Sequence, residues 1–68
     1  MRLTWYGHAA WHIQVSGFNV LVDPFLSGNP LAPVSPEEVG ADFIVVTHGH
    51  ADHLGDAVKI SKENNAPI

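Results

Sequence analysis

Three histidines and an aspartate are concentrated in the segment Thr47-His48-Gly49-His50-Ala51-Asp52-His53. His48 and His50 are two positions apart, so in an extended loop their side chains project to the same side and can bind one metal ion. Asp52 and His53 are adjacent and project apart, so they can reach a second ion, and paired metals in hydrolases typically lie about 3.5–4 Å apart. The spacing therefore predicts a two-metal site with His48, His50, Asp52 and His53 as ligands.

The residue types of this segment indicate which metals and which reaction it can support. Imidazole and carboxylate without sulfur suit zinc, manganese or iron, and ligand type alone does not distinguish these metals. Gly49 and Ala51 are small, which leaves room for metal-bound water and for a substrate. Because two cations lower the pKa of a shared water towards about 7, we predict hydrolysis by metal-bound hydroxide, with Asp52 as the catalytic residue that orients it.

A second interpretation is that the histidines and the aspartate belong to a polar loop that packs against the following helix, with Asp52 capping that helix. Histidine is an uncommon residue, and two alternating histidines followed by an Asp-His pair match a set of metal ligands. We therefore give this interpretation less weight.

The elements before the segment indicate an antiparallel β-meander. Residues 3–6 form a short run of β-favouring types, and residues 11–15 alternate apolar and polar side chains with the period of a half-buried strand. Residues 16–19 carry turn chemistry, and residues 20–22 continue as an apolar strand that ends at Asp23-Pro24. Three short strands are thus expected before residue 24.

The elements that follow are a loop, a strand and a helix, which gives an α+β fold class. Residues 24–36 contain four prolines and show no apolar period, so we expect a long ordered loop, with a helix start at Ser35-Pro36. Residues 43–46 form a continuous apolar run, typical of a strand buried on both faces. The apolar spacing from Leu54 onward predicts a helix of about ten residues that ends at Asn64-Asn65.

Three side chains outside the metal segment carry specific expectations. Trp5 and Trp11 are predicted to lie in the core, because an aromatic residue on a strand more often packs than stacks on a substrate. His12 shares the polar face of its strand with Gln14 and Ser16, so we predict that it faces solvent.

Composition excludes several classes of function. The chain has 68 residues and no cysteine, with 46% hydrophobic and 15% charged residues, which favours a packed core over a disordered tail. The net charge is −4 and the three basic residues do not cluster, so no nucleic acid partner is expected. No window approaches the roughly 20 apolar residues of a membrane span, and the N-terminus lacks the apolar stretch of a signal peptide. We therefore expect a cytoplasmic protein.

The sequence also resembles a known family beyond the metal segment. Residues Tyr6–Ala9, Val20–Pro30 and Thr47–Ala57 together resemble the metallo-β-lactamase superfamily, in which His-x-His-x-Asp-His follows a hydrophobic strand. Within it, they are similar to a prokaryotic group of metal-dependent hydrolases related to the L-ascorbate-6-phosphate lactonases and, more distantly, to phospholipases that cleave N-acyl phosphatidylethanolamine. The resemblance implies a four-layer αββα sandwich, of which residues 1–68 form the N-terminal portion of a single domain.

The resemblance implies roles for two further residues. Asp23 would accept a hydrogen bond behind the metal loop and hold its shape, and the alternative is an ordinary turn-forming aspartate before proline. His8 would line the mouth of the site, although a lone histidine in a short connection is more often a packing or surface residue. Both are expected as supporting residues and not as ligands.

The family pattern also requires groups that residues 1–68 do not contain. It implies that the alternating histidines hold one metal and the Asp-His pair the other, and that each metal takes a later histidine, with an aspartate bridging the two. We therefore expect a second polypeptide that supplies these ligands and the C-terminal part of the fold. The complete protein could also form a homo-oligomer.

The expected function is hydrolysis of an ester, lactone, amide or phosphodiester in a small-molecule substrate, with two divalent metal ions. Zinc is favoured, and manganese and iron are the alternatives. One rival is an iron-dependent oxidoreductase of the same superfamily, although those proteins commonly carry Glu at the position of His50. Another is a non-catalytic module stabilised by metal, which a closed site with four protein ligands would support.

Overall fold

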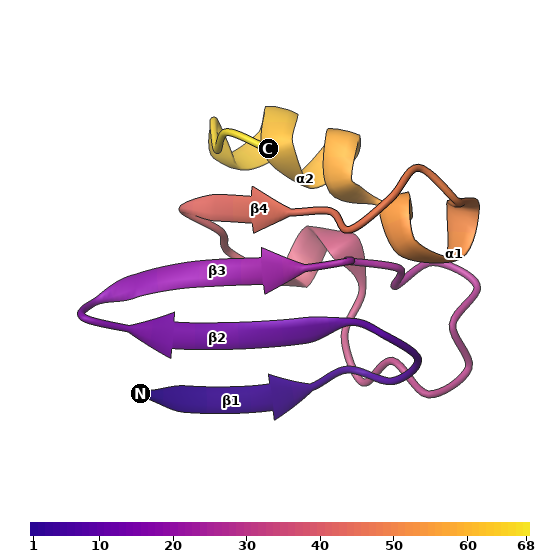
Figure 1. Ribbon diagram of the computed structural model, residues 1–68, viewed down its shortest axis with the longest axis horizontal. Helices are drawn as coiled ribbons and strands as arrows, with labels where there is room; N and C mark the ends of the chain where they lie inside the picture. The colour runs from indigo at the N-terminus through magenta and orange to yellow at the C-terminus, as the bar shows by residue number, and fades with distance from the viewer.

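Four strands form one mixed sheet in chain order in the computed structural model, which describes residues 1–68 (Figure 1). β1 pairs with β2 and β2 with β3 in antiparallel fashion, whereas β4 runs parallel to β3. The predicted meander is thus confirmed, and a parallel strand extends it. The strands span Arg2–Trp5 (β1), Trp11–Val15 (β2), Phe18–Val22 (β3) and Phe43–Val45 (β4).

The hairpin between β2 and β3 turns over two residues, Ser16 and Gly17. Both have positive φ angles, 51° and 81°, the backbone that lets a two-residue turn follow the twist of its strands. Because the turn is so short, Phe18 already pairs with Val15. β3 therefore begins two residues before the predicted strand at Val20.

The helical part of the chain is divided into three short pieces. A 3-10 turn (η1, Pro36–Glu38) begins after Ser35, whose backbone N–H donates to the Glu38 carboxylate over 3.0 Å. The predicted single helix from Leu54 is instead α1 (Ala51–Leu54) and α2 (Ala57–Asn64). α2 stops as predicted, with Asn65 in the left-handed conformation. None of these helices has the length and apolar character that crossing a membrane would require.

Gly55 is the reason that α1 and α2 are separate. Its φ is +48°, and a Cβ at this position would lie 2.5 Å from the Cα of Phe25 and 2.6 Å from the carbonyl oxygen of Pro24. Only glycine allows the chain to approach the loop after β3 so closely. α1 is therefore a separate helical turn, and it carries Asp52 and His53.

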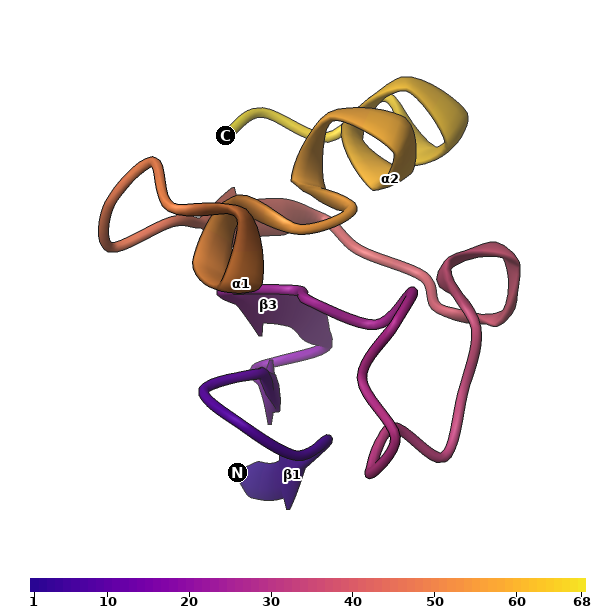
Figure 2. The ribbon, with the colours of Figure 1, turned by 90° about the vertical axis from the view of Figure 1, so that its right-hand side faces the viewer.

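The hydrophobic core lies on one face of the sheet. Leu21 and Ile44 from the strands meet Ala57 and Ile60 from α2, and all four are at most 2% exposed. Figure 2 shows that α2 and the loop between β3 and β4 lie on the same side of the sheet. These buried side chains pack α2 against the sheet.

The opposite face of the sheet is apolar and uncovered, and we refer to it as the outer face. The strand pairing places seven exposed apolar side chains together there, and their exposure ranges from 38% to 58%. The predictions that Trp5 and Trp11 lie in the core, and that β4 is buried on both faces, are therefore wrong for residues 1–68, because a layer covers only one face. The exposed residues are Leu3, Trp5, Trp11, Val15, Phe18, Phe43 and Val45.

His12 lies on the covered face and is half-buried, so the prediction that it faces solvent is wrong. Its Nδ1 lies 3.0 Å from the hydroxyl of Tyr6, and its Nε2 lies 2.9 Å from the side-chain oxygen of Asn19. Both ring nitrogens are thus paired within the protein. His12 is a packing residue and lies outside the metal segment.

Candidate metal centre

The direction of the strands explains why distant segments meet at one end of the sheet. β1 and β3 are both antiparallel to β2, and β4 is parallel to β3, so β1, β3 and β4 run the same way. Their carboxyl ends share one end of the sheet, where α1 also lies (Figure 1). The turn after β1 carries His8, Asp23 directly follows β3, and Val46–His50 leads from β4 into α1.

The structure brings the four predicted ligands together at this end. The ring centroids of His48 and His50 are 4.6 Å apart, and those of His48 and His53 are 4.0 Å apart. Asp52 Oδ1 lies 3.9 Å from His53 Nε2, and the Asp52 side chain is 50% exposed. The side chains therefore form a single cluster that is open to solvent.

Asp23 is buried behind this cluster, at 2% exposure, and both of its carboxylate oxygens accept hydrogen bonds from the metal loop. Oδ1 accepts from the backbone N–H of Thr47 over 2.7 Å, and Oδ2 accepts from the Thr47 hydroxyl over 2.8 Å. Oδ2 also lies 2.9 Å from His53 Nδ1. Asp23 thus occupies the place that the family resemblance implied, and these three contacts go beyond what a turn-forming aspartate needs.

The hydrogen bonds of Asp23 determine which imidazole nitrogens are free. A carboxylate only accepts, so His53 Nδ1 carries the proton and leaves Nε2 as a lone-pair donor. The single hydroxyl proton of Thr47 goes to Asp23, so Thr47 Oγ1 accepts from His48 Nδ1 at 2.9 Å. His48 therefore also presents its Nε2. These hydrogen bonds therefore leave the Nε2 lone pairs of two imidazoles free.

The charge of Asp23 is maintained by the same contacts. Burial acts to raise the pKa of this carboxyl, but the hydrogen bonds from His53 and Thr47 outweigh it and hold the pKa below its ordinary value. Asp23 is consequently ionised at neutral pH. Its negative charge lies 2.9 Å from His53 Nδ1.

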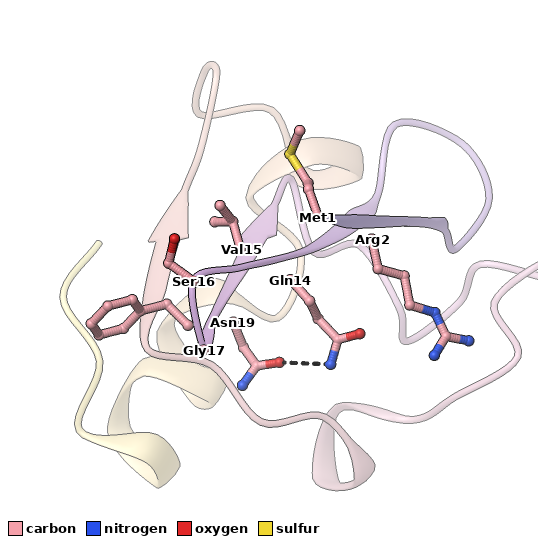
Figure 3. A pocket seen from close by; sticks show the side chains of 8 residues that line it. Met1, Arg2, Gln14, Val15, Ser16, Gly17 and Asn19 are labelled. Carbon is pink, nitrogen blue, oxygen red and sulfur yellow. Dashed lines mark hydrogen bonds between the residues drawn. The ribbon is translucent and has the colours of Figure 1, made fainter.

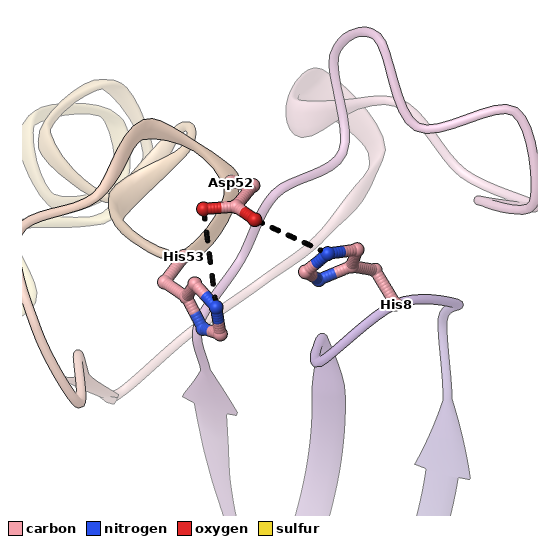
Figure 4. A group of neighbouring side chains, drawn as sticks. All are labelled: His8, Asp52 and His53. Carbon is pink, nitrogen blue, oxygen red and sulfur yellow. Dashed lines mark ion pairs between the residues drawn. The ribbon is translucent and has the colours of Figure 1, made fainter.

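His8 lies beside Asp52, closer to the predicted ligands than its expected position at the site mouth implied. Its Nε2 is 3.3 Å from Asp52 Oδ2, and its ring centroid is 5.3 Å from that of His53 (Figure 4). The indole N–H of Trp5 donates to the His8 carbonyl oxygen over 2.8 Å. The His8 side chain is 41% exposed, so it remains accessible from solvent.

Two residues that support the cluster were not singled out in the sequence. Thr47 connects Asp23 to His48, and its position directly before the histidines was the available signal. Asp56 looks like an N-cap of α2, but its carboxylate accepts from the backbone N–H groups of Leu26 and Ser27 over 3.0 and 2.8 Å. It thereby ties the end of α1 to the loop after β3.

The donor atoms fit a divalent cation. His8, Asp52 and His53 each offer one ligand atom, and these atoms all lie within 4.8 Å of one another. Two ligands at about 2.0–2.2 Å from a tetrahedral zinc lie roughly 3.3–3.6 Å apart. Asp52 Oδ2 lies 3.3 Å from His8 Nε2, which matches that separation, and the other oxygen, Oδ1, lies 3.9 Å from His53 Nε2, which is longer. Small side-chain movements would complete the geometry.

A shallow depression at the other end of the sheet offers no comparable chemistry. It lies around the β2–β3 hairpin, where Gln14 Nε2 donates to Asn19 Oδ1 over 3.4 Å and Arg2 lies at the rim (Figure 3). Its lining contains no histidine and no carboxylate that could act as a metal ligand or as a general base. We therefore assign the chemistry of this chain to the histidine cluster.

Comparison with known proteins shows the family of the chain. The family model described as "Beta-lactamase superfamily domain" matches residues 2–64. The chain is 68% identical to a UPF0173 metal-dependent hydrolase of Archaeoglobus fulgidus and 60% identical to one of Methanopyrus kandleri, in both cases over 100% of its own length. It covers 29% and 30% of those relatives, so it spans less than a third of their length.

A solved structure is similar as well. Igni18, described as a novel metallo hydrolase from the hyperthermophilic archaeon Ignicoccus hospitalis, aligns with a TM-score of 0.85 and 38% sequence identity. The alignment covers 94% of this chain and 29% of that protein. The predicted fold class is thereby confirmed: the sheet and helices match part of a metallo-hydrolase fold.

Proposed function

Because the chain belongs to the β-lactamase superfamily domain family, we propose that it forms the metal-binding part of an enzyme that hydrolyses an ester, lactone, amide or phosphodiester bond in a small-molecule substrate. Metal-dependent hydrolase is the name that its relatives carry. The observation that carries the proposal is the network of Asp23, which leaves Nε2 of His48 and of His53 free beside the Asp52 carboxylate.

The proposed cofactor is a pair of divalent ions, with zinc favoured over manganese or iron. His48 and His50 would hold one ion, and Asp52 and His53 the other. When bound, such ions supply a hydroxide nucleophile at neutral pH and stabilise the oxyanion that develops during hydrolysis.

The chain's own residues contribute positioning and proton handling. Asp23 and Thr47 fix two imidazole rings before any ligand arrives, which lowers the entropy lost on binding. Asp52 presents its two oxygens to different neighbours, Oδ1 towards His53 and Oδ2 towards His8. One oxygen can therefore act as a ligand while the other accepts a hydrogen bond from the nucleophile and orients it.

The exposure of the cluster favours an open site over a purely structural one. A structural zinc site is closed by four protein ligands, whereas a catalytic site keeps one position for water or substrate. Within residues 1–68, Asp52 is 50% exposed and His8 41%, so the side chains of this segment do not close the proposed position by themselves. His50, where the iron-dependent oxidoreductases of the superfamily commonly carry Glu, favours hydrolysis over redox chemistry.

We also propose that further polypeptide covers the outer face with a second sheet. Trp5, Phe18 and Phe43 are 53%, 51% and 46% exposed there, which is costly for a protein in water. The relatives are more than three times as long as the matched segment. That additional polypeptide would bring the remaining metal ligands and the substrate pocket. The predicted cytoplasmic location stays a prediction, to be checked by cell fractionation.

The proposed function is tested with the protein joined to the polypeptide that completes the fold. A chelator-treated preparation should hydrolyse none of a p-nitrophenyl ester, a bis(p-nitrophenyl) phosphate and a simple lactone, and adding zinc or manganese should restore turnover of at least one. His50→Gln should abolish that turnover, whereas the matched change His12→Gln should leave it unchanged. Turnover by the metal-free protein, or by the His50 variant, would refute metal-hydroxide catalysis.

A further inference from the structure

The turn between β1 and β2 delivers a third donor group to Asp52 and His53. From this geometry we infer that His8 is itself a ligand of the ion held by Asp52 and His53, which makes that position the tighter of the two metal positions formed by residues 1–68. The inference rests on the proposed metal-dependent function and assigns His8 a ligand role, where the sequence indicated only a supporting one.

The first argument is the geometry of the donor atoms. His8 Nε2 lies 3.3 Å from Asp52 Oδ2, which is close to the separation of two ligands on one tetrahedral ion. In Figure 4 the His53 ring lies below the Asp52 carboxylate and the His8 ring to its right, each facing a different carboxylate oxygen. Two imidazoles and one carboxylate also form the kind of three-ligand set that a catalytic zinc takes from its protein.

The second argument is that the turn carrying His8 is fixed in shape. His8 has a φ of 53°, in the left-handed region that histidine adopts only occasionally. The Trp5 indole N–H holds the His8 carbonyl, and the Tyr6 N–H donates to the Ala10 carbonyl over 2.8 Å. Asn29 donates to the Tyr6 carbonyl over 3.2 Å. A less common backbone held by several contacts is typical of functional positions.

The third argument is the contrast between the two metal positions. The His48–His50 pair supplies two side chains of this chain, whereas the other position gathers three, of which His53 has its tautomer set by Asp23. More preorganised ligands give tighter binding, because less freedom is lost when the ion enters. The first equivalent of metal should therefore go to His8, Asp52 and His53.

The rival explanation is that His8 only donates a hydrogen bond to Asp52. A partner of that kind typically changes metal affinity by about 10–100-fold when it is removed. A lost ligand should cost more than that range and should remove a metal–nitrogen bond. The two explanations therefore differ both in affinity and in a spectroscopic signal.

The test uses cadmium as the probe and the purified protein labelled at its histidine nitrogens. NMR with spin-active cadmium detects each metal–nitrogen bond as a scalar coupling. We expect one equivalent of cadmium to couple to Nε2 of His8 and of His53, and a second equivalent to couple to His48 and His50. Coupling to His53 without His8, or filling of His48 and His50 first, would overturn the inference.

A variant pair separates this inference from the proposed function. His8→Asn keeps a residue that tolerates left-handed backbone, so the fold should persist, and we expect the first binding step to weaken by more than about 100-fold, beyond the range of an outer partner. The matched change His12→Asn should leave that step unchanged. A loss within that range would overturn the inference. Cadmium coupling to His8 in a protein without hydrolase activity would instead refute only the proposed function.

Discussion

Replacing Asp23 by Asn should disable the metal site through the tautomer of His53. Asn fits the positive φ of 46° at this position and has the same shape as Asp. It presents one oxygen and one NH2 group. If the oxygen keeps the Thr47 N–H, the NH2 group faces His53 Nδ1 and the Thr47 hydroxyl, which both need an acceptor.

The expected magnitude comes from these contacts. To avoid two donors facing each other, His53 must accept at Nδ1 and carry its proton on Nε2, so the atom that should bind metal is blocked. We expect metal affinity to fall by about 10–100-fold, the usual effect of losing such a partner. Because hydrogen bonds to a buried charged group contribute roughly 1.5–3 kcal/mol, we also expect the free energy of unfolding to drop by about that amount.

The assay is a zinc titration against a chromophoric chelator, combined with urea unfolding of the metal-free protein. The matched control is Asp42→Asn, because the Asp42 carboxylate also accepts a hydrogen bond from a backbone N–H, that of Asn19 at 2.7 Å. Asp42 lies just before β4 and Asn19 near the start of β3, so this contact is at the opposite end of the sheet from the cluster. The control should lose stability without losing metal affinity. Wild-type zinc affinity in Asp23→Asn would refute the reasoning about His53.

Three further substitutions probe the supports of the site. Gly55→Ala places a Cβ 2.5 Å from the Phe25 backbone at a positive φ, so it should lower the free energy of unfolding in urea by more than the roughly 1 kcal/mol that an unstrained Gly-to-Ala change adds; an unchanged free energy of unfolding would contradict the close approach. Asp56→Ala leaves two backbone N–H groups of the loop after β3 without an acceptor, so the free energy of unfolding should fall by about 1–3 kcal/mol and the metal affinity should weaken. Wild-type values for both would argue against a supporting role of the Asp56 hydrogen bonds. Trp5→Phe removes the donor to the His8 carbonyl, so hydrogen exchange in the β1–β2 turn should accelerate, and unchanged exchange would show that other contacts hold the turn.

Much of the fold could be predicted because local patterns were strong. Alternation from Trp11 to Val15 and the turn residues after it indicated the hairpin, and Asn65 marked the end of α2. What alternation cannot tell is which face of a strand is covered. The core packs against the face that carries His12 and Leu21, so Trp5 and Trp11 lie on the outer face instead.

The site was predictable where its residues are consecutive and not where it depends on tertiary approach. The spacing of residues 48–53 indicated a ligand cluster by itself. The interruption at Gly55 arises from contact with Phe25, which lies thirty positions earlier in the chain and leaves no periodic signal. The position of His8 beside Asp52 depends on β1 and β4 running in the same direction, which the sequence of either strand does not specify.

The central claim is that the histidine cluster at the end of β4 binds divalent metal through imidazole Nε2 atoms. It is tested most directly by a crystal structure of the zinc-loaded protein, with anomalous diffraction measured on both sides of the zinc absorption edge. We predict anomalous peaks about 2.0–2.1 Å from Nε2 of His48 and of His53, with Asp23 still hydrogen-bonded to His53 Nδ1. Zinc bound through His53 Nδ1, or peaks found only away from this cluster, would contradict the account.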